Sequence, residues 1–159
     1  MSKMNKPFDV VLMVGIPASG KTTFCRDFLF PSHLYISLDQ LRTRSAETEL
    51  FKFALNRRKS CVVDNTNINV AERNRYISMA REIKDVRIVV YCFVPDLNGC
   101  LARNDKRAGR AHVPASAVKE RLGKFEMPDF DEGIDEIFYV RTSENGFEIR
   151  RRDEKEKPG

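Results

Sequence analysis

One short segment near the start of the chain constrains the fold more than any other. The spacing G-x-x-x-x-G-K-[ST] is met by Gly15, Gly20, Lys21 and Thr22, directly after the apolar run Val10–Val14. It is the pattern of a phosphate-binding loop between a buried strand and a helix. The glycines let the backbone curl, so that successive N–H groups point at one place, at the positive end of the helix that begins near Lys21. The segment predicts an α/β fold that binds a nucleoside triphosphate.

The residues of this loop have separate expected roles. Lys21 is expected to reach the β- and γ-phosphates and to take part in catalysis, and Thr22 is expected to offer its hydroxyl to Mg²⁺. The loop residues expected to bind the nucleotide are Gly15, Ile16, Pro17, Ala18, Ser19, Gly20, Lys21, Thr22 and Thr23.

Strand and helix patterns alternate along the chain, which is typical of a parallel sheet with helical crossovers. Continuous apolar runs predict central strands at Val10–Val14, Leu34–Ser37, Cys61–Asp64 and Val86–Phe93. Helical patterns separate them, and Ile137–Val140 and Phe147–Ile149 predict a closing hairpin around the Asn145-Gly146 turn. We expect one α/β domain over residues 1–149 and a charged, disordered tail over residues 150–159.

Composition excludes several classes of protein. The 159 residues are 42% hydrophobic and 32% charged, as in ordinary globular domains, and no apolar stretch is long enough to span a bilayer. The four cysteines show no C-x-x-C spacing, so we expect buried free thiols and a cytoplasmic protein without membrane partners. The net charge of +5 is a modest hint of a polyanionic partner, and a generally basic surface explains it about as well.

Asp39 and Arg42 follow the second predicted strand, at the carboxyl edge where open α/β sheets bind ligands. A carboxylate there can take the proton of an attacking hydroxyl. Arg42, one helical turn later, is expected to share its face and to hold an anionic group of the acceptor. In the alternative interpretation, Asp39 only caps the helix that follows.

The third predicted strand also ends in an acid, in the segment Asp64-Asn65-Thr66-Asn67. A carboxylate at a strand tip beside the phosphate-binding loop typically meets the Mg²⁺ shell. We therefore expect Asp64 near the metal, and Asp64, Thr66 and Asn67 near the acceptor. A plain polar turn is the alternative.

A basic stretch lies further along the chain. If it is helical, Arg103, Lys106, Arg107 and Arg110 form one basic stripe, which Gly109 and Pro114 would interrupt. Arginines on a lid over the γ-phosphate neutralise charge in the transition state, so we expect Arg103 and Arg107 to bind the nucleotide and Arg107 to act in catalysis. A solvated basic face is the alternative.

Taken together, these motifs resemble those of the polynucleotide 5′-hydroxyl kinases, above all the kinase module of the animal enzymes that join a kinase to a 3′-phosphatase. The resemblance rests on the phosphate-binding loop, Ser37-x-Asp39-x-x-Arg42, Asp64–Asn67 and the Arg103–Arg107 lid. It implies a doubly wound P-loop kinase fold with an arginine-bearing lid. It also implies Asp39 as general base and Arg42 as the clamp on the phosphate 3′ to the reacting nucleoside.

The expected function is transfer of the γ-phosphate of Mg²⁺–ATP to the 5′-hydroxyl end of DNA or RNA. A small-molecule kinase, acting on a nucleoside or metabolite, and a non-catalytic nucleotide-binding module are the alternatives. The motifs do not distinguish DNA from RNA or ATP from GTP.

Overall fold

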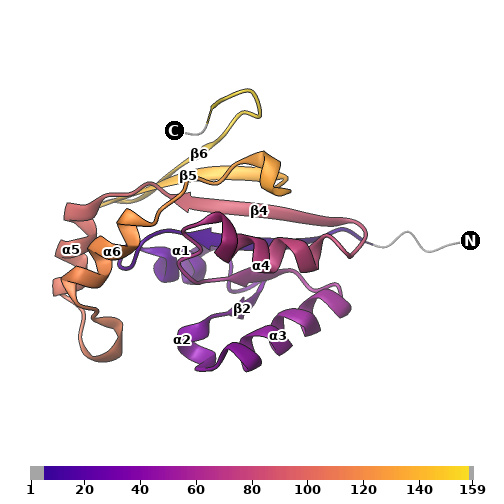
Figure 1. Cartoon of the computed structure of the whole chain (residues 1–159), viewed down its shortest axis with the longest axis horizontal. Coiled ribbons are helices and arrows are strands. Elements are labelled where there is room, and N and C mark those ends of the chain that lie inside the picture. Colours follow the sequence, from indigo (N-terminus) through magenta and orange to yellow (C-terminus); the bar gives the residue numbers. More distant parts are fainter. Residues whose placement is uncertain (1–5, 158–159) are drawn as a thin grey trace, which may run out of the picture.

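The fold is built around one six-stranded sheet, in a computed structural model that describes residues 6–157 (Figure 1). The strands are β1 Phe8–Val14, β2 Leu34–Ile36, β3 Cys61–Val63, β4 Val86–Phe93, β5 Glu136–Ser143 and β6 Gly146–Arg151. The helices are α1 Lys21–Phe28, α2 Leu38–Leu41, α3 Arg44–Asn56, α4 Val70–Ala80, α5 Leu97–Asp105 and α6 Ala115–Gly123, with single 3₁₀ turns η1 at Gly109–Ala111 and η2 at Phe130–Glu132.

The strand order is β2-β3-β1-β4-β5-β6, and only β6 runs antiparallel to its neighbour. Val10 of β1 is paired with Cys61 of β3 on one side and with Ile88 of β4 on the other. The chain leaves β1 toward one edge of the sheet and leaves β3 toward the other. The carboxyl ends of these two neighbouring strands therefore border the crevice in which such sheets bind ligands.

Both faces of the sheet are covered, as the alternation of patterns predicts. The face with Leu12 and Val90 packs against α3 and α4, and the face with Val11 and Val89 packs against α1. A third apolar cluster joins Ile16 of the phosphate-binding loop to α5 and α6. Figure 1 shows α5 and α6 beyond the arrowhead of β4, so they stand over the carboxyl edge of the sheet.

The doubly wound α/β fold is confirmed, with β1, β3 and β4 central as predicted and the closing hairpin at β5–β6. The prediction of a central strand at Leu34–Ser37 is wrong, because among the described strands β2 has β3 as its one neighbour and forms an edge of the sheet, where Leu34 and Tyr35 are only half-buried. In the turn of this hairpin the positive φ falls on Gly146, at 118°. All four cysteines are buried and free. Among the helices of residues 6–157, none has the length and apolarity that a membrane crossing needs.

The C-terminal segment differs from the sequence prediction, which begins a disordered tail at residue 150. Strand β6 continues to Arg151, and Arg152 is buried. The Arg152 guanidinium donates to the Pro128 carbonyl at 2.9 Å and to an Asp129 carboxylate oxygen at 3.0 Å. A charged sequence is thus held in place by specific acceptors. Residues 1–5 of the predicted domain and 158–159 of the predicted tail lie outside the described residues.

Candidate active site

The loop between β1 and α1 has the backbone form that its sequence predicts. Gly20, at the N-cap of α1, takes a left-handed φ of 104°. A Cβ at Gly15 would lie 2.7 Å from Ser19 Oγ and 3.0 Å from Phe93 Cβ, so no larger residue fits without displacing them. The Gly15 N–H donates to the Thr66 carbonyl at 2.9 Å, which joins the loop to the segment after β3.

Lys21 is the first residue of α1 and is buried. Its Nζ donates to the carbonyls of Gly15 and Ile16, at 2.9 and 3.0 Å. Burial lowers the pKa of Lys21 to about 8, although the nearby Asp64 charge works in the opposite direction. The cation is therefore held inside the loop, at the place where the phosphates are expected.

Asp64 comes directly after β3 and meets the start of α1. The Thr22 hydroxyl donates to Asp64 Oδ2 at 2.8 Å, and the Tyr35 hydroxyl donates to the same oxygen at 2.5 Å. Burial and the Asp64 charge raise the pKa of Tyr35, so this phenol keeps its proton and remains a donor. The two residues predicted to hold a metal, Thr22 and Asp64, are thus in contact, and Tyr35 is a contact that sequence reasoning missed.

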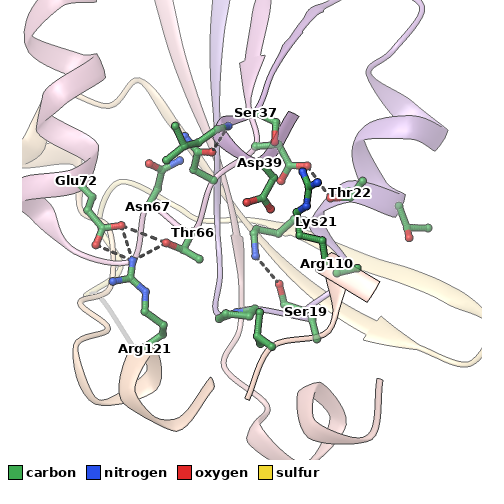
Figure 2. Close-up of a pocket in the computed structure, with 18 of the residues that line it drawn as sticks. Ser19, Lys21, Thr22, Ser37, Asp39, Thr66, Asn67, Glu72, Arg110 and Arg121 are labelled. Atoms are coloured by element: carbon green, nitrogen blue, oxygen red, sulfur yellow. Dashed lines mark hydrogen bonds and ion pairs between the residues drawn. The ribbon is translucent and has the colours of Figure 1, made fainter. Parts of the chain in front are cut away.

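These elements surround a cavity of about 750 Å³ at the carboxyl edge of the sheet (Figure 2). From the predicted site it is lined by Pro17, Ala18, Ser19, Lys21, Thr22, Thr23, Asp39, Asp64, Thr66, Asn67 and Arg107. Further residues join them from α2 to α6 and their connections: Ser37, Leu38, Arg44, Asn65, Glu72, Arg75, Tyr76, Arg110, Ala111, Val113 and Arg121.

Asp39 faces this cavity, and Ser37 rather than Asp39 occupies the N-cap of α2. The alternative in which Asp39 is only a cap is therefore wrong. The position of Arg42 differs from the expectation, because Arg42 is not among the described residues that line the cavity. Helix α2 has four residues and ends there, with Arg42 in a left-handed conformation at φ 74°. Since the helical turn does not continue, Arg42 does not share the face of Asp39.

The basic stretch is not one helical stripe. Helix α5 ends at Asp105, and Arg110 lies in η1, beyond a break at the positive φ of Gly109. Figure 2 shows Arg110 beside the cavity, which Arg107 also lines. Arg103 lies on the other side of the loop, where its Nε donates to the Ala18 carbonyl at 2.6 Å. It faces a second cavity of about 260 Å³, which shares Ser19 with the first.

Thr66 and Asn67 play partly structural roles. Asn67 is buried, and its amide donates to the Met13 carbonyl at 2.9 Å, which ties the β3 loop to β1. Thr66 lies beside an ion pair of Arg121 with Glu72, whose closest atoms are 2.7 Å apart (Figure 2).

Sequence reasoning missed four charged residues of the cavity: Arg44, Glu72, Arg75 and Arg121. They belong to three different helices, α3, α4 and α6, and in the sequence each lies in an ordinary amphipathic pattern. Glu72 had a local signal, since it lies three residues after the N-cap Asn69 and bonds to it. The arginines had none.

Comparisons with known proteins agree with this geometry. Residues 10–128 match a protein family described as an AAA domain. The chain is 28% identical over 141 residues to the bifunctional polynucleotide phosphatase/kinase of Schizosaccharomyces pombe, a match that covers 85% of the chain. The chain spans about a third of that relative, 34% of its length.

Solved structures show the same fold in kinases with different substrates. A fungal RNA kinase superposes with a TM-score of 0.68 at 16% identity, over 89% of the chain and 40% of that structure. A gluconokinase from Sinorhizobium meliloti superposes with a TM-score of 0.60 at 15% identity, over 87% of the chain and 86% of that structure. The polynucleotide kinase resemblance is confirmed at the level of family and fold, and the chain belongs to the AAA domain family as a P-loop kinase.

Proposed function

We propose that the chain transfers the γ-phosphate of Mg²⁺–ATP to the 5′-hydroxyl end of a nucleic acid. One observation carries the proposal: Asp39, Lys21 and the Thr22–Asp64 pair all line a single cavity that is rich in arginine. Phosphoryl transfer requires a base, a phosphate-binding loop (the phosphate cradle) and a set of metal ligands, all of which face the same space.

In the proposed reaction the acceptor hydroxyl lies beside Asp39, which takes its proton as the oxygen attacks the γ-phosphorus. The bond from the γ-phosphorus to the bridging oxygen breaks, and ADP leaves. Lys21 holds the β- and γ-phosphates, and Arg107 and Arg110 neutralise the charge that develops on the transferring group. The lid segment between α5 and α6, which carries these two arginines, excludes water from the transfer.

The chemistry of the donor set fits Mg²⁺. The ion prefers oxygen ligands and is commonly held by one or two protein groups together with substrate phosphates. Thr22 and Asp64 offer a hydroxyl and a carboxylate, whose oxygens are 2.8 Å apart beside the phosphate-binding loop. When bound, the ion supplies charge neutralisation on the phosphates. Tyr35 keeps the Asp64 carboxylate in place.

The charges of the cavity favour an anionic acceptor. Five arginines and Lys21 face three carboxylates, those of Asp39, Asp64 and Glu72. Two of the arginines, Arg44 and Arg75, come from α3 and α4, the helices that follow α2 in the chain. Within residues 6–157, Arg75 makes no ion pair. A neutral sugar offers such cations no partner, whereas the phosphate next to a 5′-terminal nucleoside does.

The second cavity suits the nucleoside part of the donor. It lies on the opposite side of the phosphate-binding loop, between Arg103 and Thr142. The Thr142 hydroxyl donates to the Ser19 carbonyl at 2.7 Å, so this wall is joined to the phosphate cradle. In our proposal Arg103 packs against the base, which gives it the nucleotide-binding role that its sequence predicts.

A comparison of acceptors tests the proposal. The chain is incubated with Mg²⁺ and labelled ATP, and kcat/KM is measured for five acceptors: a 5′-hydroxyl DNA oligonucleotide, the same sequence in RNA, a nucleoside 3′-monophosphate, a bare nucleoside and gluconate. We expect the phosphate-bearing acceptors to exceed the neutral nucleoside by about tenfold to a hundredfold, the usual value of a charge-assisted contact. Asp39→Asn serves as the inactive control. Faster phosphorylation of the nucleoside or of gluconate would refute the polynucleotide assignment in favour of a small-molecule kinase.

A further inference from the structure

A buried polar cluster lies behind the cavity, where α3, α4 and the loop after β3 meet. Its centre is Glu47 of α3, whose exposed fraction is 0%. Glu47 Oε1 accepts hydrogen bonds from the Tyr76 hydroxyl at 2.7 Å and from Arg44 Nη1 at 2.8 Å. Its Oε2 accepts one from Asn65 Nδ2 at 2.6 Å. A carboxylate out of contact with water needs such partners, because removing one leaves a buried charge uncompensated.

Asn65 connects this carboxylate to α2. Its Oδ1 accepts the backbone N–H of Leu38 at 3.0 Å, and Leu38 is the first residue of α2, next to Asp39. Ser37, at the N-cap, makes no side-chain capping bond. The first N–H groups of a helix have no partner within the helix, so Asn65 supplies from another element the acceptor that the local sequence lacks.

The direction of these bonds is determined by Glu47. A carboxylate only accepts hydrogen bonds, so the Asn65 side chain must turn its NH₂ toward Glu47 and its oxygen toward α2. Burial and the hydrogen bond to Glu47 raise the pKa of Tyr76 to about 12. Its hydroxyl therefore keeps its proton and stays a donor over the pH range of a kinase assay.

We propose that Glu47 is a positioning residue of the kinase: through Asn65 it fixes the first turn of α2, and with it the Asp39 carboxylate. The same carboxylate holds Arg44 at the wall of the cavity. The inference rests on the proposed function, in which Asp39 takes the proton of the acceptor, and it adds a residue that does not itself line the cavity.

The hydrogen bonds that join Glu47 through Asn65 to the Leu38 N–H form a relay from Glu47 to α2. Two single substitutions disturb the order of donors and acceptors in this relay while changing almost no side-chain volume. Arg44 and Tyr76 both donate to Glu47 Oε1, so a glutamine keeps these bonds only with its single oxygen at that place. Glu47→Gln then turns its NH₂ group toward the Asn65 NH₂ group, unless the Asn65 amide turns over and leaves the Leu38 N–H without an acceptor. Asn65→Asp places a second carboxylate against that of Glu47. For each variant we expect kcat to fall about tenfold to a hundredfold, the effect of an unsatisfied buried group, with little change in the KM for ATP.

The double variant Glu47→Gln/Asn65→Asp exchanges the donor and the acceptor of the hydrogen bond between the two side chains. The new glutamine donates to the new aspartate, whose other oxygen again accepts the Leu38 N–H. We expect the double variant to recover most of the lost kcat. If the two substitutions acted independently, their losses in kcat would add, so recovery would show that the two residues are coupled.

Tyrosine substitutions provide a milder variant and a matched control. Tyr76→Phe removes a donor to Glu47 and is expected to lower kcat. Tyr139→Phe removes a hydroxyl that is also buried but has no partner within residues 6–157. Tyr139 lies on β5, away from α2, so its variant should keep the kinetics of the wild type.

Two measurements together test the positioning role of Glu47: enzyme kinetics, and amide hydrogen exchange of residues 37–41. Exchange reports the opening of α2 independently of the reaction. We expect faster exchange in both single variants and restored protection in the double variant, in parallel with kcat. Single variants with wild-type kcat, or a double variant with additive losses, would overturn the inference. If the exchange pattern holds but the wild type leaves 5′-hydroxyl ends unmodified, the proposed function fails while the relay from Glu47 to α2 stands.

Discussion

Lys21→Met removes a buried cation and keeps the length of the side chain, so it isolates the energetic effect of that charge. Burial lowers the pKa of Lys21 from 10.5 to about 8 in the folded chain. Between these values the unfolded chain binds more protons than the folded one, so the free energy of unfolding rises with pH, by about 1.4 kcal/mol per pH unit. Below pH 8 both states carry the proton, and the full cost of the buried charge is present.

The expected change follows from these two values. From pH 7.5 to pH 9.5, the free energy of unfolding of the wild type should rise relative to that of Lys21→Met by about 2 kcal/mol. Only the difference between the two proteins is informative, because buried thiols titrate with the opposite sign. Burial raises the pKa of Cys61 and Cys92 to about 12, which lowers stability at high pH in both proteins alike.

Urea denaturation at a series of pH values measures this difference, and titration with ATP in Mg²⁺ complements it. Because a bound triphosphate favours the charged lysine, the Kd for ATP should rise above pH 8 by up to about tenfold per pH unit in the wild type, and Lys21→Met should lack this dependence. A stability difference that stays flat from pH 7.5 to pH 9.5 would show that Lys21 titrates as in water, and the reasoning from its burial would be refuted.

Three further changes test other parts of the site and fold. Asp39→Asn should lower kcat by about a hundredfold to ten-thousandfold in the kinase assay and leave the Kd for ATP unchanged; near-wild-type turnover would exclude Asp39 as the base. Arg75→Ala should raise the KM of an oligonucleotide acceptor about tenfold to a hundredfold, and the control Arg42→Ala should change this KM little. A larger rise in Arg42→Ala than in Arg75→Ala would show that Arg42 binds the acceptor phosphate. Glu132→Ala leaves the fully buried Arg73 without its carboxylate partner, 2.8 Å away, and should lower the free energy of unfolding by about 3–5 kcal/mol in urea denaturation; a loss below 1 kcal/mol would contradict this role of the pair.

The sequence alone predicts the parts of the site that depend on local chain geometry. The left-handed φ of Gly20 and the lack of space for a Cβ at Gly15 belong to a loop whose shape depends on its own residues. The apolar runs predict β1 and β3, and parallel strands place their carboxyl ends at one edge of the sheet. For these reasons the sequence predicts that Lys21, Thr22 and Asp64 lie close together, and the structure brings all three to one cavity.

Residue spacing is misleading where a helix ends or where a side chain is buried. The i, i+3 spacing of Asp39 and Arg42 implies a shared face only if the helix continues, and α2 ends at Arg42. Arg44 and Glu47 have the same spacing and look like a surface ion pair. In the fold Glu47 is fully buried, because α4 and the loop after β3 cover that face of α3 with polar partners.

What the sequence determined by itself is the strand–loop–helix unit that binds phosphate and the alternation that makes the sheet parallel, since both follow from interactions among near neighbours. The tertiary structure alone decided the order of the strands, the arginines that line the cavity and the relay from Glu47 to α2. Arg44, Arg75 and Arg121 come from three helices. Contacts between such distant segments depend on how whole elements pack, and residue spacing along the chain carries no record of that packing.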